Sequence, residues 1–119
     1  MKNKSSCLIL LGLMFVFSIS SLFAQSTTAS ISGTVVDEQQ SVIPNATVTV
    51  RNTSTGFTRT VQTSGEGRYQ IVNLPIGAYE VTVEAPNFGR FVQTGITLVV
   101  NQNAVVDATL KAGGVQETV

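Results

Sequence analysis

From Gln25 onward, apolar and polar side chains alternate in short runs, and this pattern restricts the possible folds more than any other property of the sequence. In the clearest run, Tyr79–Ala85, every second residue is apolar and the residues between are Glu or Thr. Successive side chains of a strand point to opposite faces, so a period of two indicates strands with one buried and one wet face. The 95 residues from Gln25 to Val119 include 16 Val, 5 Ile and 15 Thr, whose branched side chains favour strands. We therefore expect an all-β fold.

Turn residues separate these runs at intervals of about eight to twelve positions, a spacing typical of β-sandwiches and β-barrels. The strict alternation predicts antiparallel sheets. The third run alternates least clearly and is expected to be an edge strand. The turn at residues 101–103 is expected to close a hairpin between the last two runs. The seven runs are Ile31–Val35, Ala46–Val50, Phe57–Gln62, Tyr69–Ile71, Tyr79–Ala85, Ile96–Val100 and Ala104–Leu110.

Residues 1–24 have the pattern of a secretion signal. Lys2 and Lys4 precede eleven apolar or small residues at 7–17, which suits a signal-peptide core and falls short of the roughly 20 that span a bilayer. We predict cleavage after Ala24, and no membrane-spanning segment in the remaining chain. The alternative is an uncleaved N-terminal anchor that extends to Phe23.

Composition excludes several functions. The sequence contains no His, so neither a His-ligated zinc site nor a Ser-His-Asp or Cys-His nucleophile can be built. The single Cys, Cys7, leaves with the predicted signal. The net charge is zero, or −2 after cleavage, which argues against a nucleic-acid partner. Glu80 and Glu84 alternate on one strand and are expected to be a solvated surface. We expect no catalytic residues, no metal and no cofactor, and therefore no enzyme.

Three motifs in series resemble the carboxypeptidase regulatory-like domain. They are Ile31–Asp37 with Val42–Val48, Thr63–Tyr69, and Leu74–Phe88. The resemblance implies a seven-stranded antiparallel Greek-key β-sandwich of the transthyretin-like, or carbohydrate-binding-like, fold. It divides the chain into the signal peptide (1–24), a short linker (25–30), the sandwich (31–110) and a flexible C-terminal linker (111–119). Gly33 has no Cβ, so a neighbouring strand or a bulky ring is expected to lie close to its backbone.

The same resemblance implies a non-catalytic role. In carboxypeptidases this domain accompanies the peptidase, and similar domains follow the signal peptide of large outer-membrane proteins resembling TonB-dependent receptors. We therefore predict an exported module of a Gram-negative-type envelope, in the periplasm, at the outer membrane or secreted. It would be the N-terminal accessory domain, or a fragment, of a receptor-like outer-membrane protein, whose remaining part is the first candidate partner.

Two sets of residues are candidate binding sites. Phe88 and Phe91 are the only plausible aromatic platform for a carbohydrate, and the alternative function is a carbohydrate-binding module. The competing interpretation of both rings is a cluster that caps the sandwich. Glu117, Thr118 and Val119 resemble the start of the segment by which TonB-dependent receptors engage TonB. A tail of this kind could pair as an extended strand with a TonB-type periplasmic protein.

Overall fold

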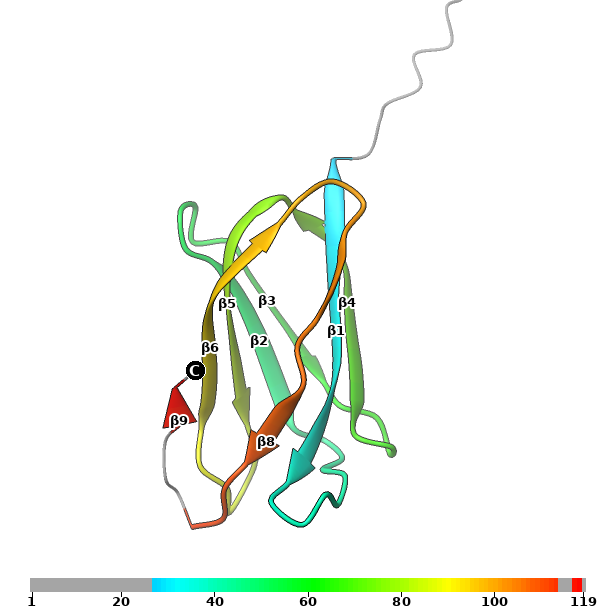
Figure 1. The fold of residues 1–119 in the computed structure, drawn as a ribbon, viewed down its shortest axis with the longest axis vertical. Helices are drawn as coiled ribbons and strands as arrows, with labels where there is room; N and C mark the ends of the chain where they lie inside the picture. The colour runs from blue at the N-terminus through cyan, green and yellow to red at the C-terminus, as the bar shows by residue number, and fades with distance from the viewer. Residues whose placement is uncertain (1–26, 114–116, 119) are drawn as a thin grey trace, which may run out of the picture.

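The computed structural model describes residues 27–113 and 117–118, which form two β-sheets packed face to face (Figure 1). The predicted signal peptide, residues 25–26 and Val119 lie outside the described residues. In the described part no helix is long and apolar enough to cross a membrane. The strands are β1 (Thr28–Asp37), β2 (Thr47–Asn52), β3 (Thr58–Gln62), β4 (Arg68–Pro75), β5 (Gly77–Glu84), β6 (Phe91–Leu98), β7 (Asn103–Val105), β8 (Ala108–Leu110) and β9 (Glu117–Thr118). The expected all-β sandwich is confirmed.

The larger sheet has the strand order β3-β2-β5-β6-β9. At its centre Val48 pairs with Val83 and Val50 with Val81, and these four side chains have no exposed surface. The apolar positions of the clearest run thus face the core, as predicted. The third run, β3, is the outermost strand on one side, which confirms the expected edge.

The edge strand β3 lies beside the edge strand β4 of the other sheet. Arg59 extends from β3, and its Nη1 donates a hydrogen bond of 2.6 Å to the carbonyl oxygen of Val72 in β4. The Arg59 guanidinium also lies 5.2 Å from the centre of the Phe57 ring. The Arg59 side chain therefore links β3 to β4 along this side of the sandwich.

The smaller sheet has β1 at its centre, between β4 on one side and β7 and β8 on the other. β4 pairs with β1 antiparallel, whereas β7 and β8 both pair with β1 in parallel. The prediction of purely antiparallel sheets is therefore wrong for the last run. Alternation shows which side chains face the core, but it carries no information on strand direction.

The expected hairpin at residues 101–103 is also wrong. β6 belongs to the larger sheet and β7 to the smaller one, so this turn carries the chain across the sandwich. Asn101 adopts a left-handed conformation there, with a φ of 61°, and its N–H donates to the carbonyl oxygen of Thr28 at 2.9 Å. The turn chemistry was visible in the sequence, but the pairing partner was not.

Three element boundaries differ from the sequence prediction. β1 starts at Thr28, inside the expected linker at 25–30. The sixth run begins at Phe91 and ends at Leu98, rather than spanning 96–100. The last run is divided into β7 and β8 by Val106 and Asp107. The ladder between β1 and the last run is interrupted at these two residues.

Candidate functional site

The division between β7 and β8 lies opposite Gly33 and Thr34 of β1. The register does not change across it, because Ser32 pairs with Val105 and Val35 with Ala108. A continuous parallel ladder would direct the Thr34 N–H to the carbonyl oxygen of the residue after Val105. In the structure Thr34 instead donates to Oδ1 of the Asp107 carboxylate, at 2.9 Å. A side chain thus replaces one main-chain hydrogen bond.

The carbonyl group released by this exchange is that of Val106, and it accepts a hydrogen bond of 2.5 Å from the Tyr69 hydroxyl. Tyr69 lies on β4 directly across from Gly33 and is 5% exposed. Burial raises the pKa of the Tyr69 hydroxyl, and the negative charge of Asp107 raises it further. The hydroxyl therefore remains protonated and remains a donor through the neutral pH range.

Gly33 makes this arrangement possible. A Cβ at this position would collide with the Val106 carbonyl oxygen and would lie 2.9 Å from Cε1 of Tyr69. The expectation that a ring approaches the Gly33 backbone is confirmed. The sequence did not reveal that the ring belongs to Tyr69, or that a carbonyl group also occupies the space.

An open groove of about 590 Å³ lies over the same part of the smaller sheet. Residues of β1, β4 and β7 line it, together with Ser64 and Asp107 from the adjoining connections. The main-chain groups beneath it are largely used in strand pairing, so the groove offers mainly side-chain donors and acceptors. This site was not predicted from the sequence, although Ser32 and Thr34 were visible as the wet positions of the first run. The principal polar groups are Ser32, Thr34, Arg68, Gln70 and Asp107.

The structure separates the two candidate aromatic residues. Phe91 is the first residue of β6, is 6% exposed and packs among the core residues between the sheets. Phe88 lies in the preceding loop, is partly buried and packs against that core. The two rings were expected in one loop, but Phe91 is a strand residue directed inward. Phe91 therefore offers no exposed ring face to a carbohydrate.

The first residues of the expected flexible C-terminal linker lie beside the β5–β6 loop. The Gly89 N–H donates to the Lys111 carbonyl oxygen at 2.6 Å, and the Gly113 N–H donates to the Asn87 carbonyl oxygen at 3.1 Å. Ala112 forms a β-bridge with Phe88 between these two bonds. Main-chain hydrogen bonds thus hold the start of the linker against the domain. Such bonds cannot be predicted from the pattern of apolar residues.

Further along, Glu117 and Thr118 form β9, which pairs in parallel with Phe91 and Val92 of β6. Figure 1 shows β9 beside β6 at the edge of the larger sheet. The candidate partner-binding residues Glu117 and Thr118 therefore lie on the domain itself. The third residue of that set, Val119, lies outside the described residues.

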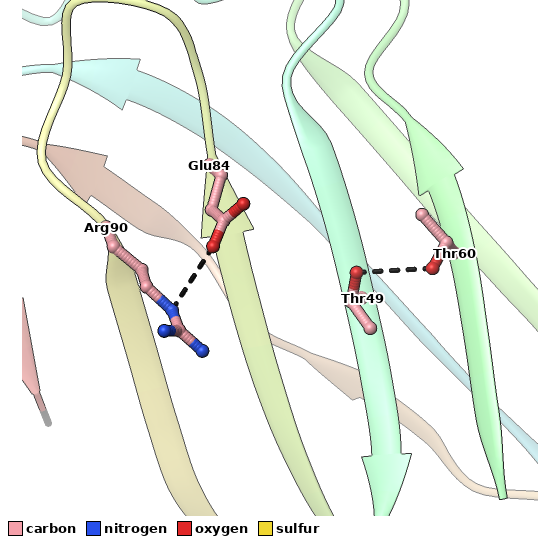
Figure 2. A network of polar contacts seen from close by, with 4 residues as sticks. All are labelled: Thr49, Thr60, Glu84 and Arg90. Carbon is pink, nitrogen blue, oxygen red and sulfur yellow. Dashed lines mark hydrogen bonds and ion pairs between the residues drawn. The ribbon is translucent and has the colours of Figure 1, made fainter.

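The exposed face of the larger sheet is held by ordinary polar contacts (Figure 2). Arg90 Nε lies 3.3 Å from Glu84 Oε1, with both side chains about half exposed. The hydroxyl groups of Thr49 and Thr60 lie 3.2 Å apart across the β2–β3 pair. Within residues 27–113 and 117–118, no three side chains of His, Cys, Asp or Glu come together as metal ligands would.

Comparisons with solved structures place this sandwich among known β-domains. The Bacillus anthracis TIE protein superposes with a TM-score of 0.61 and 26% identity over 72% of this chain and 17% of that one. A streptococcal ancillary pilin superposes with a TM-score of 0.57 at 13% identity, covering 74% of this chain and 33% of the pilin. Hydroxyquinol 1,2-dioxygenase from Pseudomonas putida gives a TM-score of 0.60 at 10% identity, over 76% and 58%. At such identities, the pilin and the dioxygenase share the fold alone.

Sequence comparison is more specific. The TonB-dependent transporter Oar of Myxococcus xanthus is 37% identical over 102 residues, which are 84% of this chain and 9% of the transporter. The chain thus spans about a tenth of the length of this relative. The sequence profile of the carboxypeptidase regulatory-like domain matches residues 30–111. These residues include β1 to β8 almost entirely, with the Gly33–Tyr69 contact and the polar groove. The chain belongs to the carboxypeptidase regulatory-like domain family.

Proposed function

We propose that this chain is a non-catalytic, exported envelope module that serves as the N-terminal accessory domain of a receptor-like outer-membrane protein. The observation that carries the proposal is the match to a TonB-dependent transporter over 84% of the chain. The predicted signal peptide at 1–24 supports export, and a short linker would then lead into the sandwich. The partner of the folded domain is the remaining part of such a receptor.

The tail supports a second partner of the same system. Glu117, Thr118 and Val119 are proposed to engage a TonB-type periplasmic protein by strand addition, in which main-chain hydrogen bonds supply the affinity. Three residues are too few to pair over a useful length, so residues beyond Val119 are required. A mean strand has about five to six residues.

Two measurements test this function. Mass spectrometry of the chain exported by a Gram-negative host should show loss of residues 1–24, and retention of an intact N-terminus in the membrane fraction would contradict cleavage and support the uncleaved anchor. A titration with a TonB-type C-terminal domain, followed by NMR, should give negligible shifts for the chain ending at Val119. A chain extended by several β-prone residues should shift at Glu117 and Thr118. The tail is only a linker if the extended chain shows no shift there.

The polar groove supports one alternative, a carbohydrate-binding module. Its lining combines a cationic donor, Arg68, an anionic acceptor, Asp107, and neutral groups such as Gln70 that both donate and accept. This mixture suits sugar hydroxyl groups, each of which is also both donor and acceptor. The volume of about 590 Å³ lies within the range of small-ligand sites, roughly 300–1,000 Å³.

A titration with maltotriose, cellotriose and chitotriose separates this alternative from the accessory role. Binding in the groove would shift the amides of Thr34 and Gln70, and Gln70→Ala would weaken it. The matched control is Thr60→Ala on the far face of the larger sheet, which would leave binding unchanged. No shift in the groove with any of the three sugars removes the alternative.

A further inference from the structure

The outer edge of β6, on the side away from β5, is paired with the short strand β9. β9 consists of Glu117 and Thr118 alone, and its partners are the first two residues of β6. The chain reaches this edge after residues 111–113 have been fastened to the β5–β6 loop by main-chain hydrogen bonds. The two residues that pair with this edge are therefore only a few positions beyond a part of the chain that is bonded to the domain.

The edge limits how far this pairing extends. The pairing between β5 and β6 shifts register between Tyr79 and Val81, opposite Gln93 and Ile96. Gly95, which lies within this irregularity, has a φ of 74°. A bulge of this kind bends and twists an edge strand, which ends regular pairing on its outer side. The accepting surface is thus the short stretch that begins at Phe91 and ends near Gln93.

Val92 gives this stretch a second distinguishing feature. It is 8% exposed, although it is absent from the cluster of residues that pack between the two sheets. Its pairing partner is Thr118. The edge at Phe91–Val92 therefore combines a short row of main-chain groups with an apolar side chain outside the core.

We propose that the β6 edge is a strand-acceptor site that orders the C-terminal tail and presents it as the outer strand of the sheet to a partner's extended strand. A strand has two hydrogen-bonding edges, and pairing with β6 uses only one of them. The other edge of Glu117–Thr118 faces away from the sheet. A partner strand that pairs there meets residues that are already extended, so less conformational entropy is lost on binding. This inference rests on the proposed function, because it assumes that the tail has a strand-pairing partner.

The first test asks whether the tail docks in the register seen, without any partner. Val92→Cys and Thr118→Cys are introduced together in a Cys7→Ser background, so these are the only two thiols of the chain. Neighbouring strands lie about 4.8 Å apart, which is within the range that a disulfide bridges. The matched control pairs Thr118→Cys with Thr97→Cys, because Thr97 lies on β6 beyond the bulge. We expect intramolecular disulfide formation at least about tenfold faster in the first variant. Equal rates in the two variants would overturn the acceptor site.

A second measurement keeps the β6 side chains native, in case Val92→Cys disturbs the fold. Glu117→Pro with Thr118→Pro removes both N–H donors of β9, whereas Glu117→Ala with Thr118→Ala retains them. Hydrogen exchange should accelerate in the proline variant at those amides of Phe91–Gln93 that face away from β5, and remain unchanged in the alanine variant. Unchanged exchange in both variants would also overturn the acceptor site.

The final test asks whether the docked tail is accessible to a partner strand. It uses the chain extended beyond Val119 that carries Val92→Cys and Thr118→Cys. Binding is compared with the disulfide between these two residues formed and with it reduced. Binding to the TonB-type C-terminal domain should be about threefold to tenfold tighter with the disulfide formed, because the tail is then held in its paired conformation. Weaker binding of the oxidised form would show that docking masks the tail, and would overturn presentation. Absence of binding in both forms would reject the partner itself, whereas the docking measurements above report on the acceptor site independently.

Discussion

Two segments of the C-terminal part of the chain form parallel strand pairs, and they differ in what holds them. β7 and β8 pair with β1 in the smaller sheet, whereas β9 pairs with β6 at the edge of the larger sheet. In the first pair Val106, Ala108 and Leu110 are 1–3% exposed and pack between the sheets. The second pair spans the two residues of β9 and lies at the outer edge of the larger sheet. Core packing therefore adds to strand pairing in the first pair, whereas short length and an edge position characterise the second.

The comparison shows where a sheet can tolerate an irregularity. The β1 ladder is interrupted in its middle, yet both displaced groups find side-chain partners, Asp107 for the Thr34 N–H and Tyr69 for the Val106 carbonyl oxygen. The bond to the Val106 carbonyl oxygen is buried, where an unpaired polar group is costly, so this half of the interruption requires an internal partner. The bond between Thr34 and Asp107 is exposed. At the β6 edge water can satisfy any group that the tail leaves, so pairing there can be reversible.

The largest expected effect is that of Gly33→Ala, because its Cβ would collide with the Val106 carbonyl oxygen. We expect a loss of about 3 kcal/mol or more in the free energy of unfolding, measured by urea denaturation. The matched control is Gly65→Ala, where an added Cβ meets no atom within 4 Å. Similar urea midpoints for the two variants would contradict the close approach at Gly33.

Tyr69→Phe is expected to have the next largest effect. It removes the only hydroxyl group that bonds to the Val106 carbonyl oxygen in the described structure, and leaves that oxygen inside the sheet. We expect a loss of about 1–3 kcal/mol in the free energy of unfolding. A variant as stable as the parent would mean that water or the Thr34 N–H replaces the hydroxyl group without cost.

The raised pKa of the Tyr69 hydroxyl should make the stability of the domain fall at alkaline pH. Above about pH 10 the Tyr69 hydroxyl ionises in the unfolded chain while it stays protonated in the folded one. The unfolded state then binds fewer protons, so stability falls with pH by up to about 1.4 kcal/mol per unit. Titration of the urea midpoint from pH 8 to 11 should show this fall in the parent and a shallower one in Tyr69→Phe. Parallel curves would show that Tyr69 is not the group responsible.

Asp107 should contribute less, because its carboxylate is at the surface. Asp107→Ala removes the acceptor of the Thr34 N–H and is expected to cost about 1 kcal/mol. Asp107→Asn retains a side-chain oxygen that can accept the same bond, so it should lie closer to the parent. Equal losses in both variants would indicate that the charge of Asp107, rather than its hydrogen bond, is what matters.

The smallest expected effect belongs to the tail. Glu117→Pro with Thr118→Pro should change the free energy of unfolding by less than about 0.5 kcal/mol, because β9 is two residues long and lies at the edge of its sheet. The same variant is nevertheless expected to accelerate hydrogen exchange on β6. A loss of stability comparable to that of Tyr69→Phe would remove the distinction between the two parallel pairs.

The candidate sites show that closeness in sequence does not predict which side chains form one surface. Phe88 and Phe91 are three residues apart, and the sequence grouped them as one platform. The structure places Phe91 in a strand facing the core and leaves Phe88 in the loop. The polar groove was missed because its members come from three strands and two connections, which only tertiary pairing brings together. No local signal joins Arg68 to Asp107.

The class of fold, the side chains that face the core and the edge position of β3 could all be predicted from the residues alone. These follow from alternation and turn chemistry, which act over a few residues and leave a local pattern. Three features became visible in the folded chain: β7 and β8 run parallel to β1, Tyr69 completes the interrupted ladder, and Glu117–Thr118 pair with β6. Each of these depends on main-chain groups finding partners far along the chain. Every residue carries the same main-chain donor and acceptor, apart from proline, so the sequence does not record which partner each will find.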